Sequence, residues 1–421
     1  MQFLISAGEA SGEAHGAELI RALRACVTEA EFFGVGGSAM RAAGCDLVVN
    51  ARDVAVVGLT EVVKHLPGIY RRFHQLLAAA DERRPDAAIL IDFPDFNFRL
   101  ARQLHRRGIP VFYYISPQLW AWRRGRIELV RRYVRRMLVI FPFEHQFYAD
   151  HGVRTSYVGH PLAELARPRL SREALATEAG LNADNRWIAL LPGSRQREVL
   201  MNLPEMLRAA TLLSSDASLK PQSGSDNCRY EFVLPVASTL DRDWLRGVLE
   251  QQEHTHGRKR TGTSATGADV PPQLPQIRLT TDARAALAHA RAAIVASGTA
   301  TLEAALLGTP FVMVYQVSPL TWSLGRHLVK VPHFGIVNLI LGRRAVPEFV
   351  QQQFRAANVA SALASLIRES PERQAQLAAF AELRQKLSAG GEEPAPCRAA
   401  RIIVEELRPP GVHCDSLDGK R

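Results

Sequence analysis

Short apolar runs alternate with longer segments of helical periodicity, and this pattern occurs twice along the 421-residue chain. The apolar runs are bounded by Gly or Pro and have the length of strands that are buried on both faces. The expected strands are Gln2–Ser6, Glu31–Val35, Ala87–Asp92, Val111–Ile115, Arg136–Ile140, Thr155–Val158, Trp187–Leu191, Tyr230–Pro235, Gln276–Leu279, Ala293–Ala296 and Phe311–Tyr315.

Between these runs, apolar residues recur at i, i+3 and i+4, which predicts helices over Gly16–Cys26, Ile69–Glu82, Phe98–Arg107 and Thr301–Leu307. Strands that alternate with helices form parallel sheets covered on both faces. The sequence therefore predicts an α/β protein with two Rossmann-like, doubly wound domains that face each other across a cleft.

The polar, Pro-rich stretch 162–186 separates the two repeats of this pattern, so we expect one domain over residues 1–167 and another over 186–345. Two segments within the second domain, 214–228 and 251–275, lack periodicity and are expected to be mobile surface insertions. Residues 346–408 are expected to form C-terminal helices that can pack back on the first domain, followed by a flexible tail at 409–421.

Composition and charge narrow the class of protein. Five scattered cysteines without a C-x-x-C pair argue against a zinc ribbon or a disulfide framework. The N-terminus has no basic region before its apolar residues, and the apolar stretch 292–317 is interrupted by Gly, Pro and Glu. We therefore expect a cytoplasmic protein without a transmembrane helix. A net charge of +10 favours anionic partners, but the lone cluster Arg258–Arg260 is too small to predict nucleic-acid binding.

The first expected strand leads directly into a loop that contains Gly8, Glu9, Ser11 and Gly12. In a doubly wound domain the first such loop commonly meets a ligand, and glycines let the backbone approach it. A plain tight turn is the structural alternative. The later segment Gly34–Ala39 matches G-x-G-x-x-G/A, but it follows the second strand and lacks the expected acidic partner, so we do not predict dinucleotide binding.

Asp92 lies at the end of an all-apolar strand, where a partly buried carboxylate is suited to act as a general base. The alternative role is that of a helix N-cap, which suits Asp95 better because the next helix starts directly after it.

Two segments combine apolar and basic residues in the manner of a membrane-contacting surface. One contains Trp120 and Trp122 beside a run of arginines, and the other, 54–77, presents Val62, Val63, Leu66 and Ile69 among Lys, His and Arg. A solvated basic face and an ordinary core are the respective alternatives.

In the second half, two strands run into glycine loops at helix starts, the geometry that binds phosphate through backbone N–H groups. The first loop contains Gly193, Ser194 and Arg195, and the second contains Ser297, Gly298 and Thr299. Glu303, one turn into the following helix, is placed to hold ribose hydroxyls. Two such loops predict a nucleoside-diphosphate site. The chain has no cluster with metal-ligand spacing, so neither a metal nor a cofactor is expected.

Ten collinear motifs resemble the lipid-A-disaccharide synthase family, which consists of inverting glycosyltransferases of the two-domain GT-B type. They are GEASGE (8–13), GVGGSAMRAAG (34–44), VVGLTEVVKHLP (56–67), IDFPDFN (91–97), SPQLWAWRRGR (116–126), FPFE (141–144), GHPL (159–162), LLPGSRQREV (190–199), SGTATLE (297–303) and VPHFGIVNLILGR (331–343). The sequence departs from the family at Glu13, where Asp is common, and in the two insertions.

The resemblance implies transfer of a sugar from UDP-2,3-diacylglucosamine to 2,3-diacylglucosamine 1-phosphate (lipid X), giving a β-1,6-linked disaccharide 1-phosphate and UDP. It also implies that Asp92 is the base, that Arg195 meets the diphosphate, that Glu303 meets the ribose and that Asn338 contributes to the UDP site. Peripheral contact with the anionic inner membrane follows from the same resemblance. A homodimer is left open. The alternatives are another GT-B enzyme that uses UDP-GlcNAc, such as an epimerase or a cell-wall lipid GlcNAc transferase, and a non-catalytic binding protein.

Overall fold

The structure is a computed structural model, and it describes residues 1–8, 10–54, 59–121, 124–165, 167–216, 219, 229–261, 274–319, 322–323, 331–388 and 393–408. Within these ranges, only the backbone is described for residues 10–11, 59–65, 124, 164–165 and 256–261. The chain forms two compact units. One comprises Met1–Pro161 and the segment that begins at Leu387, and the other comprises Leu162–Lys386.

The first unit is built on a parallel sheet with the order β3-β2-β1-β4-β5-β6-β7. Its strands are β1 (Gln2–Ala7), β2 (Glu31–Gly36), β3 (Cys45–Asn50), β4 (Ala87–Ile91), β5 (Val111–Tyr114), β6 (Arg136–Val139) and β7 (Thr155–Tyr157). Its helices are α1 (Ala10–Cys26), α2 (Ser38–Ala42), α3 (Leu59–Arg83), α4 (Pro94–Arg106), α5 (Ile127–Tyr133), α6 (Pro142–Asp150) and α17 (Ala395–Leu407).

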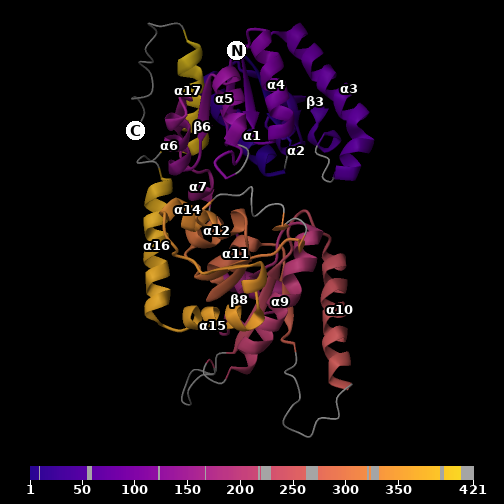
Figure 1. Cartoon of the computed structure of the whole chain (residues 1–421), viewed down its shortest axis with the longest axis vertical. Helices are drawn as coiled ribbons and strands as arrows, with labels where there is room; N and C mark the ends of the chain where they lie inside the picture. The colour runs from indigo at the N-terminus through magenta and orange to yellow at the C-terminus, as the bar shows by residue number, and fades with distance from the viewer. Residues whose placement is uncertain are drawn as a thin grey trace. The chain divides into compact units, whose positions relative to one another are not determined.

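Successive residues of each central strand point to opposite faces of this sheet, so two separate cores form. Leu4 and Leu90 pack in the core that includes residues of α3, α4 and α5. Phe3 and Ile89 pack in the other core, with residues of α1 and α17. In Figure 1 the yellow helix α17 runs beside this N-terminal sheet, although it lies more than two hundred residues further along the chain. The side chains of Arg135 and Arg136 pair with Glu406 and hold it there.

The second unit has a parallel sheet with the order β10-β9-β8-β11-β12-β13. Its strands are β8 (Arg186–Leu191), β9 (Tyr230–Pro235), β10 (Ile277–Thr280), β11 (Ala292–Ala296), β12 (Phe311–Tyr315) and β13 (Glu348–Val350). Its helices are α7 (Leu162–Leu165), α8 (Arg172–Ala179), α9 (Gln196–Ser215), α10 (Arg242–Thr261), α11 (Ala283–His289), α12 (Thr299–Leu307), α14 (Ile336–Leu341), α15 (Ala356–Ile367) and α16 (Pro371–Leu387).

The predicted class, two Rossmann-like domains with parallel sheets, is confirmed. The sequence reading missed β3 and β13, each of which lies at the edge of its sheet and pairs with a single neighbour. Edge strands are short or half-exposed and lack the all-apolar signature of buried parallel strands. In β3 only Cys45 and Val49 are buried, and β13 has three residues.

The structure also corrects several expected boundaries. Helix α10 continues to Thr261, so residues 251–261 of the second expected insertion are helical, and residues 214–215 of the first belong to α9. The stretch between the predicted domains contains α8 and belongs to the second unit. The second unit also includes α15, whereas α17 belongs to the first. The tail 409–421 and the remainder of both insertions, except residues 216, 219, 274 and 275, lie outside the described residues.

Candidate active site

Each sheet reverses its strand order at one point, and the expected site loops lie at these two points. In the first unit, β1 and β4 are neighbours, with Ala7 opposite Ile91, so the loops that begin at Gly8 and Asp92 leave the sheet side by side. In the second unit, β8 and β11 are neighbours, with Leu191 opposite Val295. Ligands of open α/β sheets bind beyond the carboxyl ends of the strands at such a reversal.

Asp92 lies in a strained turn at the end of β4. Asp92 and Phe93 have φ values of 43° and 51°, and Ile115, at the end of the neighbouring strand β5, has a φ of 64°. Left-handed conformations are costly for residues other than glycine, and above all for a β-branched isoleucine. Such strain persists where the surrounding structure holds it, and it is concentrated at functional sites.

The contacts that hold this turn come from buried polar side chains. The Tyr113 hydroxyl donates to the carbonyl oxygen of Asp92 at 2.5 Å, and the Asn97 side-chain amide donates to the same oxygen at 2.8 Å. The Ser6 hydroxyl in turn donates to the Asn97 side-chain oxygen at 2.7 Å. Ser6 and Asn97 are fully buried, and their hydrogen bonds join strand β1 and helix α4 to the backbone of the Asp92 turn.

The expectation that Asp95 caps α4 is wrong. The N-cap is Phe93, and Asp95 lies within the first helical turn, where its carboxylate pairs with Arg126 at 2.5 Å. The Asp95 side chain is therefore exposed and forms an ion pair, whereas the half-buried Asp92 lies at the end of β4.

The first glycine loop is closely packed. A Cβ atom at Gly8 would lie 2.3 Å from the ring of Phe93, so a side chain at this position would push against the Asp92 turn. Ser11 and Gly12 belong to the first turn of α1, Gly12 is buried, and Glu9 lies outside the described residues.

The segment that formally matched a dinucleotide fingerprint binds a protein carboxylate. Glu13 accepts a hydrogen bond from the backbone N–H of Ala39 at 2.6 Å, and a Cβ atom at Gly37 would lie 2.2 Å from the Glu13 carboxylate. The N-terminus of α2 is thus occupied by this side chain.

Sequence reasoning missed a buried carboxylic acid at the same edge of the first sheet. Glu144, in the first turn of α6, accepts hydrogen bonds from the Trp120 indole N–H at 3.2 Å and the Phe141 backbone N–H at 3.2 Å. Burial raises the pKa of Glu144 to about 8, against the opposing effect of these donors. The signal in the sequence was a glutamate within the apolar motif FPFE.

His160, which follows β7, is the second buried ionisable group at this edge. Burial lowers the pKa of its imidazole to about 3, and the charge of His15 acts in the same direction. The imidazole lies against the Phe141 ring, with ring centroids 5.0 Å apart.

The residues expected to contact the membrane differ in how exposed their side chains are. Trp120 is 9% exposed and packs edge-on against Phe143, so it presents almost no surface to a lipid. On α3, Leu66 is 51% exposed, whereas Ile69 packs partly against the core. Trp122 and the side chains of Val62 and Val63 lie outside the described part of the chain.

In the second unit, the loop after β8 is shaped by a carboxylate. Glu198, in the first turn of α9, accepts hydrogen bonds from the backbone N–H groups of Ser194 (3.0 Å) and Arg195 (3.3 Å). The Arg195 guanidinium group lies 3.3 Å from the other oxygen of Glu198 and is largely exposed. Gly193 has a φ of 130°, and a Cβ atom there would lie 2.6 Å from Glu198. The N–H groups expected to bind phosphate thus bind this carboxylate in the structure.

The loop after β11 is open. Gly298, the N-cap of α12, and Thr299 are exposed, and Ser297 is half-buried. The first N–H groups of a helix have no partner within that helix, so they are available to an anion. Glu303 is half-buried and pairs with Arg284 at 3.3 Å, so a ribose hydroxyl would compete with this ion pair.

Asn338, expected at the UDP site, contacts the segment between α14 and β13, and its role in UDP binding stays a prediction. It is fully buried; its side-chain oxygen accepts hydrogen bonds from the backbone N–H groups of Ala345 and Val346, and its amide donates to Glu348 at 2.8 Å. Its contacts hold the chain between α14 and β13. By contrast, the unpredicted Asn202 on α9 donates to the carbonyl oxygen of Pro192 at 2.8 Å, directly at the loop after β8.

Among the described residues there is no group of three or more His, Cys, Asp or Glu side chains that could hold a metal ion. Within the same ranges, no helix combines the length and the apolar character needed to cross a membrane.

Comparison with known proteins shows the family of the chain. The chain matches the family model described as lipid-A-disaccharide synthetase over residues 3–222 and 259–403. It is 52% identical to a lipid-A-disaccharide synthase of Koribacter versatilis, with 96% of this chain and 98% of the relative covered. It is 48% identical to another of Acidobacterium capsulatum, with 96% of both chains covered.

Solved structures with similar folds are more distant in sequence. A glycotransferase of kitacinnamycin superposes with a TM-score of 0.60 at 16% identity, covering 97% of this chain and 99% of that one. A putative UDP-N-acetylglucosamine 2-epimerase from Listeria monocytogenes gives 0.58 at 13%, covering 96% and 95%. At such identities the likeness shows the fold alone. With two reversal-point loops in parallel sheets and close relatives over nearly its full length, the chain belongs to the lipid-A-disaccharide synthase family.

Proposed function

We propose that this protein is a hexosyltransferase that moves the sugar of UDP-2,3-diacylglucosamine onto the 6-hydroxyl of 2,3-diacylglucosamine 1-phosphate and releases UDP. The observation that carries the proposal is that the two reversal points present different chemical groups. One presents a strained, half-buried aspartate, and the other presents an arginine and two glycine loops at helix starts. A base suits the acceptor hydroxyl, and the second arrangement suits a departing diphosphate.

In this reaction Asp92 accepts the proton of the acceptor hydroxyl as the oxygen attacks the anomeric carbon. An α-linked donor gives a β-linked product when the attack occurs opposite the bond to UDP. A well-placed general base accounts for about 10²- to 10⁴-fold in rate. The diphosphate leaves with its electron pair, and the charge that develops on it is stabilised by Arg195 and by the N–H groups of Gly298 and Thr299.

Binding of the diphosphate at the first loop requires displacement of the Glu198 carboxylate from the N–H groups of Ser194 and Arg195. The Glu198 carboxylate and a phosphate oxygen accept hydrogen bonds from the same N–H groups. Glu198 therefore keeps these N–H groups oriented for phosphate before the nucleotide binds.

The reaction is tested by UDP release from UDP-2,3-diacylglucosamine, with and without 2,3-diacylglucosamine 1-phosphate, in detergent with EDTA. We expect acceptor-dependent UDP release and a disaccharide 1-phosphate product. Turnover of UDP-GlcNAc without the acylated acceptor would contradict the proposal and would favour the epimerase alternative.

We further propose that the enzyme works at the cytoplasmic face of the inner membrane, where both acylated substrates lie. Leu66 and Tyr70 are 51% and 66% exposed on α3, and the basic side chain of Arg71 is exposed beside them. Exposed apolar side chains flanked by basic residues are typical of helices that lie on an anionic membrane.

Sedimentation with phosphatidylglycerol vesicles tests this contact. Leu66→Ser combined with Tyr70→Ser should reduce the vesicle-bound fraction, whereas Leu212→Ser, at a 40% exposed position on α9, should not. Equal binding by all three proteins would contradict the assignment of α3.

A further inference from the structure

Glu144 is a buried carboxylic acid that no step of the proposed reaction uses. It lies in the first turn of α6, the helix that follows β6. Burial of a carboxyl group costs free energy, which its contacts must offset. Two roles can account for such a group: it reacts with a ligand, or it holds other parts of the protein in place.

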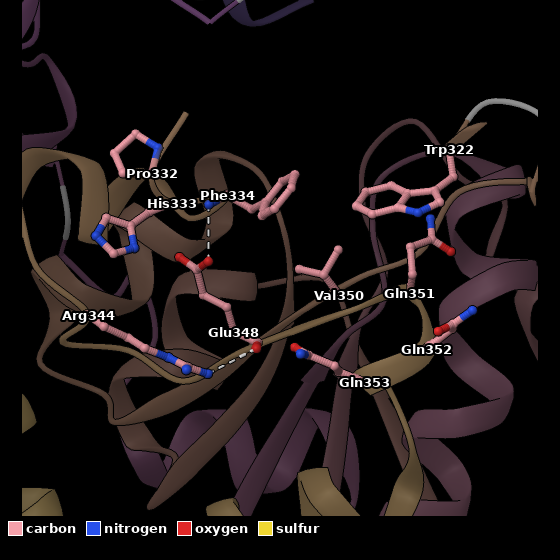
Figure 2. A pocket seen from close by; sticks show the side chains of 10 residues that line it. All are labelled: Trp322, Pro332, His333, Phe334, Arg344, Glu348, Val350, Gln351, Gln352 and Gln353. Carbon is pink, nitrogen blue, oxygen red and sulfur yellow. Dashed lines mark hydrogen bonds between the residues drawn. The ribbon is translucent and has the colours of Figure 1, made fainter. Parts of the chain in front are cut away.

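Glu144 presents almost no surface to a substrate. Glu348, a buried glutamate of the second unit, offers a comparison, because its side chain lines a cavity of about 550 Å³ (Figure 2). Figure 2 also shows that the Glu348 carboxylate accepts a hydrogen bond from the Phe334 backbone N–H. Glu348 is 9% exposed, whereas Glu144 is 1% exposed. The role of Glu144 therefore follows from its contacts within the protein.

These contacts hold the loop that follows β5. The Glu144 carboxyl group accepts a hydrogen bond from the Trp120 indole N–H at 3.2 Å. At the other end of the loop, the Ser116 hydroxyl shares a hydrogen bond of 2.6 Å with the Tyr148 hydroxyl, which also belongs to α6. Helix α6 thus contacts both ends of the segment 116–120.

The residue before this segment contacts the Asp92 turn. The Asp92 backbone N–H donates to the Ile115 carbonyl oxygen at 3.3 Å. Ile115 has a φ of 64°, a conformation that is costly for a β-branched residue and persists where surrounding contacts hold it. The contacts of α6 supply such a hold, because the segment 116–120 follows Ile115 directly.

We propose that Glu144 is a positioning residue for Asp92: it holds the segment 116–120 through Trp120, and this segment keeps Ile115 against the Asp92 backbone. The inference rests on the proposed function, because it takes Asp92 to be the base for the acceptor hydroxyl. Glu144 itself touches no substrate. Its removal frees the loop, and a displacement of about 1 Å at a reacting group can cost about 10²-fold in rate.

The protonation of Glu144 gives this role a pH dependence. Burial raises its pKa to about 8, so the acid is neutral at lower pH. The phenols of Tyr148 and Tyr157 face it, and burial raises the pKa of each above its usual range. The imidazole of His160 lies against Phe141, and burial lowers its pKa to about 3. Of these groups, Glu144 alone changes charge near pH 8, and a charge buried there should loosen the loop.

Steady-state kinetics of the full-length protein below and above pH 8, together with UDP titration, test the inference. Glu144→Ala should lower kcat by about tenfold to a hundredfold. Its UDP affinity should stay within about twofold of wild type, because Glu144 and the UDP loops belong to different units. Trp120→Phe keeps an aromatic ring but loses the indole N–H, so it should lower kcat in the same direction.

Glu144→Gln separates positioning from a general effect on the fold. The glutamine keeps an accepting oxygen and stays neutral, so it should retain most of the wild-type kcat and lose the decline above pH 8. Glu128→Gln is the matched control, because Glu128 is an exposed glutamate of α5 that pairs with Arg131. It should keep both the wild-type kcat and the wild-type pH profile.

Hydrogen–deuterium exchange supplies a readout that does not depend on turnover. In Glu144→Ala and Trp120→Phe, exchange should become faster in peptides that contain residues 92–97 and 115–121, and Glu128→Gln should leave it unchanged. If Glu144→Ala does not fold, Trp120→Phe and Glu144→Gln still decide the question.

The inference is overturned if exchange at the Asp92 turn stays as slow as in the wild type, or if Glu144→Gln declines above pH 8 as the wild type does. A loss of kcat with an equal loss of UDP affinity would also overturn it, because it would indicate general damage to the fold. Failure of the proposed reaction is a separate outcome. A wild-type protein without acceptor-dependent UDP release would contradict the transferase, while the exchange measurement would still show whether Glu144 holds the Asp92 turn.

Discussion

The side-chain amide of Asn97 donates a hydrogen bond to the carbonyl oxygen of Asp92 at 2.8 Å, and Asn202 makes the same contact with Pro192 at the same distance. Each asparagine is buried in the helix that follows a central strand, and each binds the first residue beyond that strand. In both units, therefore, a buried asparagine amide holds the backbone at the reversal point.

Removal of these two amides should affect different steps. Asn97→Ala should lower kcat and leave UDP affinity unchanged, because it frees the turn that carries the proposed base. Asn202→Ala should weaken UDP binding. Asn97→Ala removes the acceptor of the buried Ser6 hydroxyl and one of the two donors to Asp92, and Asn202→Ala removes the side-chain donor to Pro192. Loss of such buried hydrogen bonds costs about 1–3 kcal/mol of stability. Steady-state kinetics, UDP titration and thermal unfolding of both variants check this, and a matching loss of UDP affinity in both would contradict the assignment.

Asp92→Asn should reduce turnover by about 10²- to 10⁴-fold, because the amide cannot accept a proton from the acceptor hydroxyl. UDP affinity should not change, since Asp92 and the UDP loops belong to different units. Asp95→Asn is the matched control, and it should keep near-full activity because the Asp95 side chain pairs with Arg126 in an exposed ion pair. If Asp92→Asn turned over at the wild-type rate, the base would have to be another residue.

Glu198→Gln should strengthen UDP binding several-fold. The glutamine oxygen can still accept hydrogen bonds from Ser194 and Arg195, but the negative charge that opposes the diphosphate is removed. Arg195→Lys should weaken binding, because lysine lacks the bidentate geometry of arginine. Titration with UDP distinguishes the two, and parallel losses would instead indicate that Glu198 contacts the nucleotide directly.

The stability of the protein should depend on the protonation of Glu144. Its pKa is raised from 4.5 to about 8, so between these pH values the unfolded chain is ionised there while the folded protein holds the proton. The contribution of this group is therefore most favourable below pH 4.5 and is lost as the pH rises to about 8. Glu144→Gln should remove this decline, as measured by denaturant unfolding across the range. Identical profiles for the two proteins would refute the raised pKa.

His160 should give the opposite dependence. Its pKa is lowered from 6.5 to about 3, so the unfolded chain binds a proton there in this interval while the folded protein does not. Its contribution to stability is complete above pH 6.5 and is lost as the pH falls towards 3. His160→Gln should therefore be less sensitive to acid than the wild type, with His145→Gln as a control for an exposed histidine. Equal acid sensitivity of all three would argue against a neutral His160.

The class of fold and the location of the two glycine loops could be predicted from the sequence, because buried parallel strands leave all-apolar runs and tight strand-to-helix turns favour glycine. Asp92 is a site residue by prediction alone, because the end of such a run lies at the ligand-binding edge of a sheet. The edge strands β3 and β13 escaped detection, since a strand with one neighbour need not be apolar throughout.

The contacts between polar residues, by contrast, could not be predicted from the sequence. Asn97, Asn202 and Asn338 are alike in sequence, because each is an asparagine within an apolar stretch. Two of them hold loops at the reversal points, and the third holds the chain between α14 and β13. The same is true of Glu144, whose proton affinity comes from burial beneath residues of separate elements. Hydrogen bonds and desolvation depend on distances between segments far apart in the chain, and local periodicity does not predict those distances.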